Sequence, residues 1–333
     1  MTPATPRREV RQSPFEMSPL PMARTGSSAL AIPEDQLPPN VDLLAQTPQL
    51  QALLTTMHDK TVRGEDFIFT IDRVAALVLE RATVHLPHRE KKITLFSGKE
   101  HIGCEVAAEN ICSVSILRSG AILEPSARRA IPALQAGSLL IQSDKEGEPK
   151  LYTVDLPRFL RSPTNAQSAW VLLLDSQLGT GAAALMGVRV LLDHNVKEEH
   201  IIFVTLLASA RGGVHALHRA FPRVKIVVGG VDPDLKRRVV PAPLIVPEAH
   251  AVDPKAVRGR SPATSRLLRA RSVAPRSAAF SSSTDSAWSA DDEALTDAVH
   301  STRVCWSIEP GCGNMGDRYY GVDSSRQDDL HPF

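Results

Sequence analysis

The sequence predicts an α/β fold, in which a mostly parallel sheet is flanked by helices. Short runs of almost uninterrupted apolar residues indicate strands that are covered on both faces. Helical segments separate several of these runs, and this alternation is typical of parallel strands joined by crossover helices. The predicted strands span residues 92–96, 112–117, 138–142, 171–174, 201–207 and 225–228.

Helices are predicted where apolar residues recur once per helical turn. In the segment 65–82 this spacing places Phe67, Ile71 and Val74 on one stripe. The segment 48–57 has the same pattern. Further helices are expected at residues 125–134, 182–194 and 213–221.

The composition indicates a globular protein, because 43% of the 333 residues are hydrophobic and can form a core. The 38 basic residues nearly balance the 37 acidic ones, so the net charge of +1 gives no reason to expect nucleic acid or a membrane as a partner. No apolar run approaches the roughly 20 residues that span a bilayer. The four cysteines lack CxxC spacing, which favours free thiols in a reducing compartment.

Composition also divides the chain into parts. Residues 1–36 contain Arg and Ser and are broken by proline, so a disordered tail is expected, with a transit peptide as the alternative. Residues 37–333 form one predicted domain, interrupted at about 241–304 by a long insertion rich in Ser, Ala, Arg and Pro. The insertion has no sustained apolar period, so we expect it to be disordered, with a short helix at 291–299.

A single acid follows the apolar run at 171–174. Asp175 comes at the carboxyl end of this predicted strand, where ligands of such sheets bind. The small residues Gly179, Thr180 and Gly181 come next, and a helix is expected from Ala182. Main-chain N–H groups at such a turn suit a phosphate. The alternative is an ordinary turn in which Asp175 caps the helix.

A second turn follows the predicted strand at 112–117. It places Arg118 and Gly120 where the strand opens toward the next helix. Arg118 could bind a second phosphate with its fork of N–H donors. The alternative is a surface ion pair between Arg118 and Glu124, which would contribute little stability.

A third segment, at residues 311–321, is rich in glycine and reads GCGNMGDRYYG. Closely spaced glycines expose main-chain N–H and C=O groups, which can recognise the edge of a flat polar heterocycle. The alternative is a tight glycine turn followed by a C-terminal strand.

Together these segments resemble uracil phosphoribosyltransferases, and more closely the phosphoribosyltransferase-like half of uridine-cytidine kinase-like proteins. The resemblance rests on ordered blocks that include VSILRSGAILEP, LLLDSQLGTGAAALMGVRVLLDH and PGCGNMGDRYYG. It implies a type I phosphoribosyltransferase-like fold with a small hood, and a homodimer or tetramer.

The resemblance implies transfer of ribose 5-phosphate from phosphoribosyl pyrophosphate to uracil, which yields UMP and pyrophosphate in pyrimidine salvage. It also implies Mg2+ that arrives with the substrate rather than at a protein metal site, and GTP as a candidate activator. The expected compartment is the cytoplasm, with the nucleus as the alternative.

Residue roles carry over by position. The resemblance implies catalytic roles for Arg118, Asp175 and Asp317, with Asp175 facing the ribose hydroxyls. The residues expected to bind phosphoribosyl pyrophosphate are Arg118, Gly120, Asp175, Gly179, Thr180 and Gly181. The residues expected to read the uracil edge, mainly through main-chain groups, are Ile308, Gly313, Asn314 and Met315.

The chain departs from the usual family pattern at several of these positions. The phosphate loop usually reads DPMLATGGS, but Ala183 replaces its serine. Asn314 stands where an acid commonly follows the glycines, and the usual AGESME after Arg118 becomes SGAILE. These changes favour a second hypothesis, a catalytically weak homologue that binds phosphoribosyl pyrophosphate or nucleotide and regulates a uridine kinase. A third hypothesis, a scaffold that recruits partners through the insertion, rests on composition alone.

Overall fold

The computed structural model describes residues 36–107, 110–144, 146–241 and 302–322. Its centre is an 8-stranded sheet with the order β1-β10-β9-β7-β4-β5-β6, and β8 lies beside β9. Neighbouring strands are parallel except β5 and β6, which are antiparallel. The strands are β1 (Val41–Leu43), β4 (Ile111–Leu117), β5 (Gln135–Ser143), β6 (Pro149–Asp155), β7 (Trp170–Leu174), β8 (Gln177–Leu178), β9 (Ile201–Ser209) and β10 (Lys225–Asp232). The predicted α/β class is therefore confirmed.

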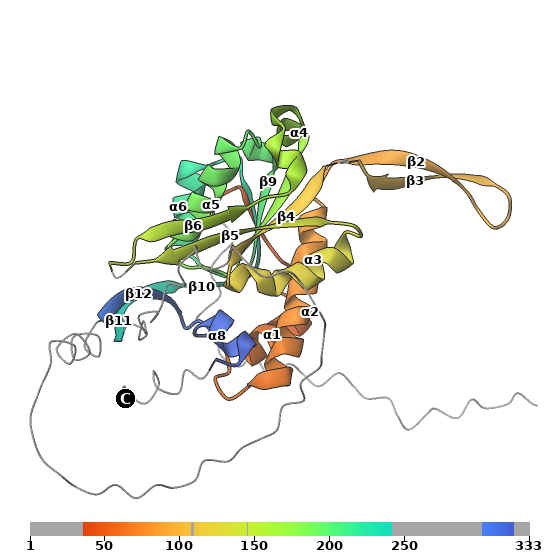
Figure 1. Ribbon diagram of the computed structural model, residues 1–333. Helices are drawn as coiled ribbons and strands as arrows, with labels where there is room; N and C mark the ends of the chain where they lie inside the picture. Colours follow the sequence, from red (N-terminus) through yellow and green to blue (C-terminus); the bar gives the residue numbers. More distant parts are fainter. Residues whose placement is uncertain (1–35, 108–109, 145, 242–301, 323–333) are drawn as a thin grey trace, which may run out of the picture.

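Helices cover both faces of this sheet (Figure 1). One hydrophobic cluster lies beneath α1 (Pro48–His58), α2 (Gly64–Thr83) and α3 (Glu124–Ala130). A second cluster lies on the other face beneath α4 (Pro163–Ser168), α5 (Ala182–Asp193) and α6 (Gly213–Ala220). Every residue of the central strand β9 is buried, as expected for a strand covered on both sides. Short 3-10 helices are η2 (Ser119–Leu123), η3 (Arg158–Arg161) and η4 (Glu198–His200).

The predicted strand at 92–96 does not belong to the central sheet. It overlaps β2 (His88–Thr94), which pairs with β3 (Glu100–Val106) in a separate antiparallel hairpin. Figure 1 shows this hairpin projecting away from the body of the protein. All but two of its 14 residues are exposed and six are Lys, Arg or Glu, so the hairpin adds little to the hydrophobic core. The helix expected at 125–134 also ends early, at Ala130.

A small two-stranded sheet is separate from the central sheet. It pairs β11 (Asp234–Pro241) with β12 (Thr302–Glu309), and α8 (Met315–Tyr320) follows. Residues 302–304, expected within the insertion, belong to β12 instead. The rest of that insertion, including the helix expected at 291–299, lies outside the described residues, as do residues 1–35 of the expected tail.

No helix in the described ranges has both the length and the apolar content needed to cross a membrane.

Candidate active site

The predicted site residues lie on three segments that meet at one edge of the sheet. The strands β4 and β7 are neighbours, and Ser115 of β4 is paired with Leu174 of β7. Because parallel strands end at the same edge, the turn after β4 and the turn after β7 lie side by side. The loop after β12 reaches the same place, because an ion pair joins Asp317 in α8 to Arg118 in the turn after β4.

Asp175 lies directly after β7 and is buried, with 8% of its surface exposed. Its Oδ1 accepts a hydrogen bond of 2.6 Å from the hydroxyl of Ser119. The main-chain N–H groups of Ser176 and Gln177 also donate to the carboxylate. Burial raises the pKa of Asp175 to about 6, although all three hydrogen bonds act to lower that pKa. Asp175 can therefore change charge near neutral pH.

The turn between β8 and α5 is held by close backbone contacts. Gly181 has a φ of 86° and precedes the first residue of α5. A Cβ atom at this position would lie 3.0 Å from the Cα of Gly213, so a side chain here would be both strained and crowded. The carbonyl oxygen of Gly179 accepts a hydrogen bond of 2.6 Å from Gly213 N–H.

Thr180 lies one residue before Gly181, the N-cap of α5. Its Oγ1 accepts a hydrogen bond of 3.2 Å from the N–H of Ala182. A threonine hydroxyl can donate one hydrogen bond while it accepts others, so its proton stays available to a ligand. The first N–H groups of a helix have no partner within the helix, and this turn therefore has the geometry of an anion site.

Arg118 is paired with Asp317, not with Glu124. Its Nη2 lies 2.8 Å from Oδ1 of Asp317, and its side chain is 56% exposed. The alternative expectation of a pair with Glu124 is wrong, because Glu124 is paired with Arg128 within α3. Two of the predicted catalytic residues are thus in direct contact across two segments.

Gly120 is required by packing against β7. A Cβ atom at this position would lie 2.2 Å from the carbonyl oxygen of Leu174. Any larger residue would push the turn after β4 away from the end of β7. The structure gives Gly120 this role whether or not it also contacts a ligand.

The loop after β12 is anchored to the sheet by Asp232. Oδ2 of Asp232 accepts a hydrogen bond of 2.8 Å from the N–H of Gly311 and lies 2.9 Å from Nε2 of His58. The other ring nitrogen of His58 lies 2.6 Å from the carbonyl oxygen of Leu54. Both ring nitrogens face acceptors, and the hydrogen bond to Asp232 is the main reason that the pKa of His58 is raised.

Arg318 provides a second anchor for this loop. Its guanidinium group donates to four main-chain carbonyl oxygens at 2.7 to 2.9 Å and lies 3.9 Å from the ring centroid of Phe67. The carbonyls belong to Met57, Asp59, Val62 and Cys312. The side chain thereby ties α8 to the segment that links α1 and α2.

The residues expected to read uracil differ in how accessible they are. The side chains of Ile308 and Met315 are buried in the hydrophobic core. Oδ1 of Asn314 accepts a hydrogen bond of 3.2 Å from the N–H of Asp317 and so caps α8. Gly313 is exposed, with a φ of 72°. A ligand would thus meet main-chain groups and the amide nitrogen of Asn314. The alternative of a C-terminal strand is wrong, because the helix α8 follows the glycines.

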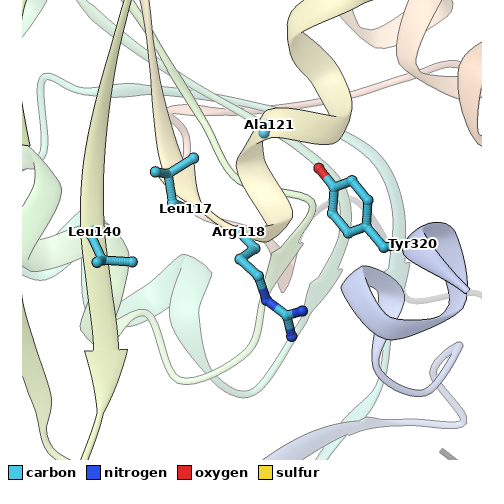
Figure 2. A pocket seen from close by; sticks show the side chains of 5 residues that line it. All are labelled: Leu117, Arg118, Ala121, Leu140 and Tyr320. Carbon is cyan, nitrogen blue, oxygen red and sulfur yellow. The ribbon is translucent and has the colours of Figure 1, made fainter. Parts of the chain in front are cut away.

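A cavity of about 240 Å³ lies beside Arg118 (Figure 2). Leu117 and Leu140 line it on the side of the sheet, and Tyr320 extends from α8 on the other side. Ala121 and Arg118 complete the lining. The cavity is therefore next to the ion pair that joins two of the three segments.

In the described ranges, no group of three or more His, Cys, Asp or Glu side chains is arranged to hold a metal ion. The three carboxylates at this edge are already engaged, Asp175 with Ser119, Asp317 with Arg118 and Asp232 with His58. Mg2+ commonly uses one or two carboxylates and the phosphates of a substrate, so the residues present fit an ion that arrives on a phosphate ligand.

Sequence reasoning missed four polar residues of this site: Ser119 as a partner of Asp175, and His58, Asp232 and Arg318 as anchors. Only Ser119 left a signal, because it is one of the departures from the sequence pattern that the resemblance implies.

Comparison with known proteins finds similar sequences and a similar fold. Residues 44–243 match the family described as uracil phosphoribosyltransferase, which is more than half of the chain. The segment 302–322, which carries α8, lies outside that match. A uracil phosphoribosyltransferase from Dictyostelium discoideum is 39% identical over 207 residues, covering 61% of this chain and 92% of that protein.

A mouse protein described as uridine-cytidine kinase-like 1 is 38% identical over 197 residues, covering 59% of this chain and 35% of that protein. This chain thus spans about a third of that relative's length. A solved structure, the AQ2163 protein from Aquifex aeolicus, superposes with a TM-score of 0.56 at 20% identity, covering 85% of this chain and 99% of that one. This likeness supports the fold alone. The chain belongs to the uracil phosphoribosyltransferase family.

Proposed function

We propose that this protein transfers ribose 5-phosphate from phosphoribosyl pyrophosphate to uracil and forms UMP and pyrophosphate. One observation carries the proposal: the ion pair of Arg118 with Asp317 and the hydrogen bond of Ser119 to Asp175 join three segments at one edge of the sheet. Phosphoribosyl pyrophosphate, the donor of the transferred group, and uracil, its acceptor, would lie next to each other when bound to these segments. Such proximity is the main requirement for a group transfer.

The donor would bind to the two turns that follow β4 and β7. Asp175 would accept hydrogen bonds from the ribose hydroxyls when it is ionised. The N–H groups at the start of α5 and the hydroxyl of Thr180 would hold the 5-phosphate, because this turn has the geometry of an anion site. Arg118 would bind the pyrophosphate, and the exposure of its side chain allows it to exchange Asp317 for that ligand.

In the reaction, positive charge develops at the anomeric carbon of the sugar and negative charge on the leaving pyrophosphate. An ionised Asp175 beside the ribose and Arg118 beside the pyrophosphate would each stabilise the charge that develops next to it. Magnesium bound with the donor would neutralise charge on the pyrophosphate. Uracil would be oriented by the main chain around Gly313 and by the amide of Asn314, because the side chains of Ile308 and Met315 are buried.

Specific residues favour a second candidate function. Ala183 and Asn314 replace a serine and an acid that are usual in the family, which removes a hydroxyl from the phosphate turn and a charge from the uracil loop. The second candidate is a protein that binds phosphoribosyl pyrophosphate or nucleotide, turns over little substrate, and regulates a uridine kinase.

One experiment separates the two candidates. The full chain is incubated with labelled uracil, phosphoribosyl pyrophosphate and Mg2+, and UMP is measured alongside the Asp175→Asn variant. We expect UMP from the wild type and at least tenfold less from the variant. Binding of the donor by calorimetry without UMP at high protein concentration would support the second candidate and exclude the first.

We also propose that the protein forms a homodimer or tetramer, that GTP activates it, and that it works in the cytoplasm or the nucleus. Family resemblance alone supports these points. Sedimentation of the full chain with and without GTP, combined with the UMP assay, tests the first two.

A further inference from the structure

Ser119 directly follows Arg118 in the turn after β4, in the segment SGAILE at residues 119–124. Its hydroxyl donates a hydrogen bond of 2.6 Å to Oδ1 of Asp175, a contact that alanine at this position could not make.

Ser119 is held firmly against the end of β7. It begins η2, with Arg118 as the one residue between η2 and β4, and β4 is paired in register with β7. The adjacent Gly120 packs so closely on the carbonyl oxygen of Leu174 that no Cβ atom would fit. Asp175 directly follows Leu174, and Ser119 directly precedes Gly120. The close contact of Gly120 with Leu174 therefore positions both the Ser119 hydroxyl and the Asp175 carboxylate.

Among the described residues, the Asp175 carboxylate has no cationic partner. The Ser119 hydroxyl supplies its side-chain hydrogen bond. The remaining donors to Asp175 are main-chain N–H groups. Neither β9 nor η2, which adjoin Asp175, contains an ionisable side chain. The charged groups at this edge pair with each other, Arg118 with Asp317 and His58 with Asp232.

Burial acts against ionisation of Asp175. It raises the pKa of the carboxyl group, and the hydrogen bond from Ser119 is the largest influence that lowers it. Removal of this hydrogen bond alone would therefore shift the titration of Asp175 to higher pH.

We propose that Ser119 is a positioning residue: its hydroxyl orients the Asp175 carboxylate toward the donor site and keeps it ionised at neutral pH. This inference rests on the proposed function, in which the ionised carboxylate receives the ribose hydroxyls. In this role the hydroxyl acts through the Asp175 carboxylate. Because two main-chain N–H groups also donate to the carboxylate, loss of the Ser119 hydroxyl should shift the pH dependence rather than abolish activity.

The test compares the full-length wild type with Ser119→Ala and Ser119→Thr. Ser113→Ala is the matched control, because Ser113 lies on β4 and its hydroxyl has no hydrogen-bond partner. Carbon NMR of protein labelled at the aspartate carboxyl groups follows the titration of Asp175, and its signal is assigned by its loss in Asp175→Asn. Calorimetry measures the affinity for phosphoribosyl pyrophosphate over the same pH range.

In Ser119→Ala, we expect the Asp175 titration to move up by roughly one pH unit, from the strength of one hydrogen bond to a charged group. The low-pH decline of donor affinity and of kcat/KM for UMP formation should move with it. Ser119→Thr should restore the wild-type titration, and Ser113→Ala should not change it.

Coincident Asp175 titrations in wild type and Ser119→Ala would overturn the inference. So would an equal shift in Ser113→Ala. If the wild type forms no UMP, the proposed activity fails, but the carboxyl titration still decides whether Ser119 controls the ionisation of Asp175.

Discussion

The part of the site proposed to bind phosphoribosyl pyrophosphate, here called the donor side, and the part proposed to bind uracil, here called the acceptor side, are built in different ways. On the donor side, Arg118 and Asp175 follow two paired strands of the central sheet, and close packing at Gly120 fixes their separation. On the acceptor side, the loop after β12 is held by the polar anchors Asp232 and Arg318. The donor side should therefore be sensitive to added volume, and the acceptor side to the loss of single polar groups.

The largest expected effect is on the acceptor side. Arg318→Leu should lower the free energy of unfolding by about 3 kcal/mol, because four carbonyl oxygens lose a charged donor. Urea unfolding measures this change. The control is Arg189→Leu, in which an arginine that is 70% exposed is removed from α5, with an expected effect within about 0.5 kcal/mol. Equal losses in both variants would contradict the anchoring role.

Gly120→Ala tests the packing of the donor side. We expect a loss of about 2 kcal/mol in urea unfolding, because the new methyl group overlaps the carbonyl of Leu174. Gly103→Ala on the β2–β3 hairpin is the control, since a Cβ atom there makes only an ordinary contact at 3.8 Å. If Gly120→Ala is as stable as the control, the turn is not fixed by this contact.

Asp175→Asn tests the charge on the donor side. We expect kcat/KM for phosphoribosyl pyrophosphate to fall at least tenfold, or about 1.4 kcal/mol, because the amide is a weaker acceptor for the ribose hydroxyls. Steady-state measurement of UMP formation gives the value. Asp193→Asn, at an exposed position on α5, serves as the control. Unchanged kinetics in Asp175→Asn would remove this residue from the site.

Thr180→Ala should also weaken use of the donor by about tenfold, because the phosphate turn loses its hydroxyl. The KM for the donor is expected to carry most of the change. Thr180→Ser keeps the hydroxyl and should behave like the wild type. A similar loss in both variants would mean that the methyl group, rather than the hydroxyl, matters at this position.

The smallest expected effect depends on pH. The pKa of His58 is raised in the folded protein, so its stabilisation is complete below about pH 6.5 and is lost as the pH rises through that raised pKa. The difference in unfolding free energy between wild type and His58→Gln should be about 1 kcal/mol at pH 6 and smaller at pH 9. If the difference in unfolding free energy between wild type and His58→Gln is the same at both pH values, the charge on the His58 ring does not contribute to stability.

The sequence was informative about the donor side because its signals are local. An apolar run followed by Asp175 and small residues predicts a strand that ends at a binding edge, and β7 and α5 follow that pattern. The anchors of the acceptor side join residues far apart in the chain, such as Arg318 with Met57 and His58 with Asp232. Nothing in the local pattern around these residues specifies such contacts.

The β2–β3 hairpin was missed for a different reason, because the segment at 92–96 was expected to be a strand of the central sheet. The segment that forms β2 has strand-like residues, but its many charges should have excluded it from a sheet covered on both faces. Likewise, the change in composition predicted a boundary near residue 241, where β11 ends, but it did not predict that residues 302–304 belong to β12.

The pairing of β11 with β12 has a consequence for how the chain can vary. Pro241 is the register partner of Thr302, so the two residues that flank the segment 242–301 lie opposite each other at the end of the ladder. Doubling the number of residues between two fixed positions adds only about 0.6 kcal/mol of closure entropy. Residues could thus be gained or lost at this tip without altering the register that delivers Glu309 and the following turn to the sheet.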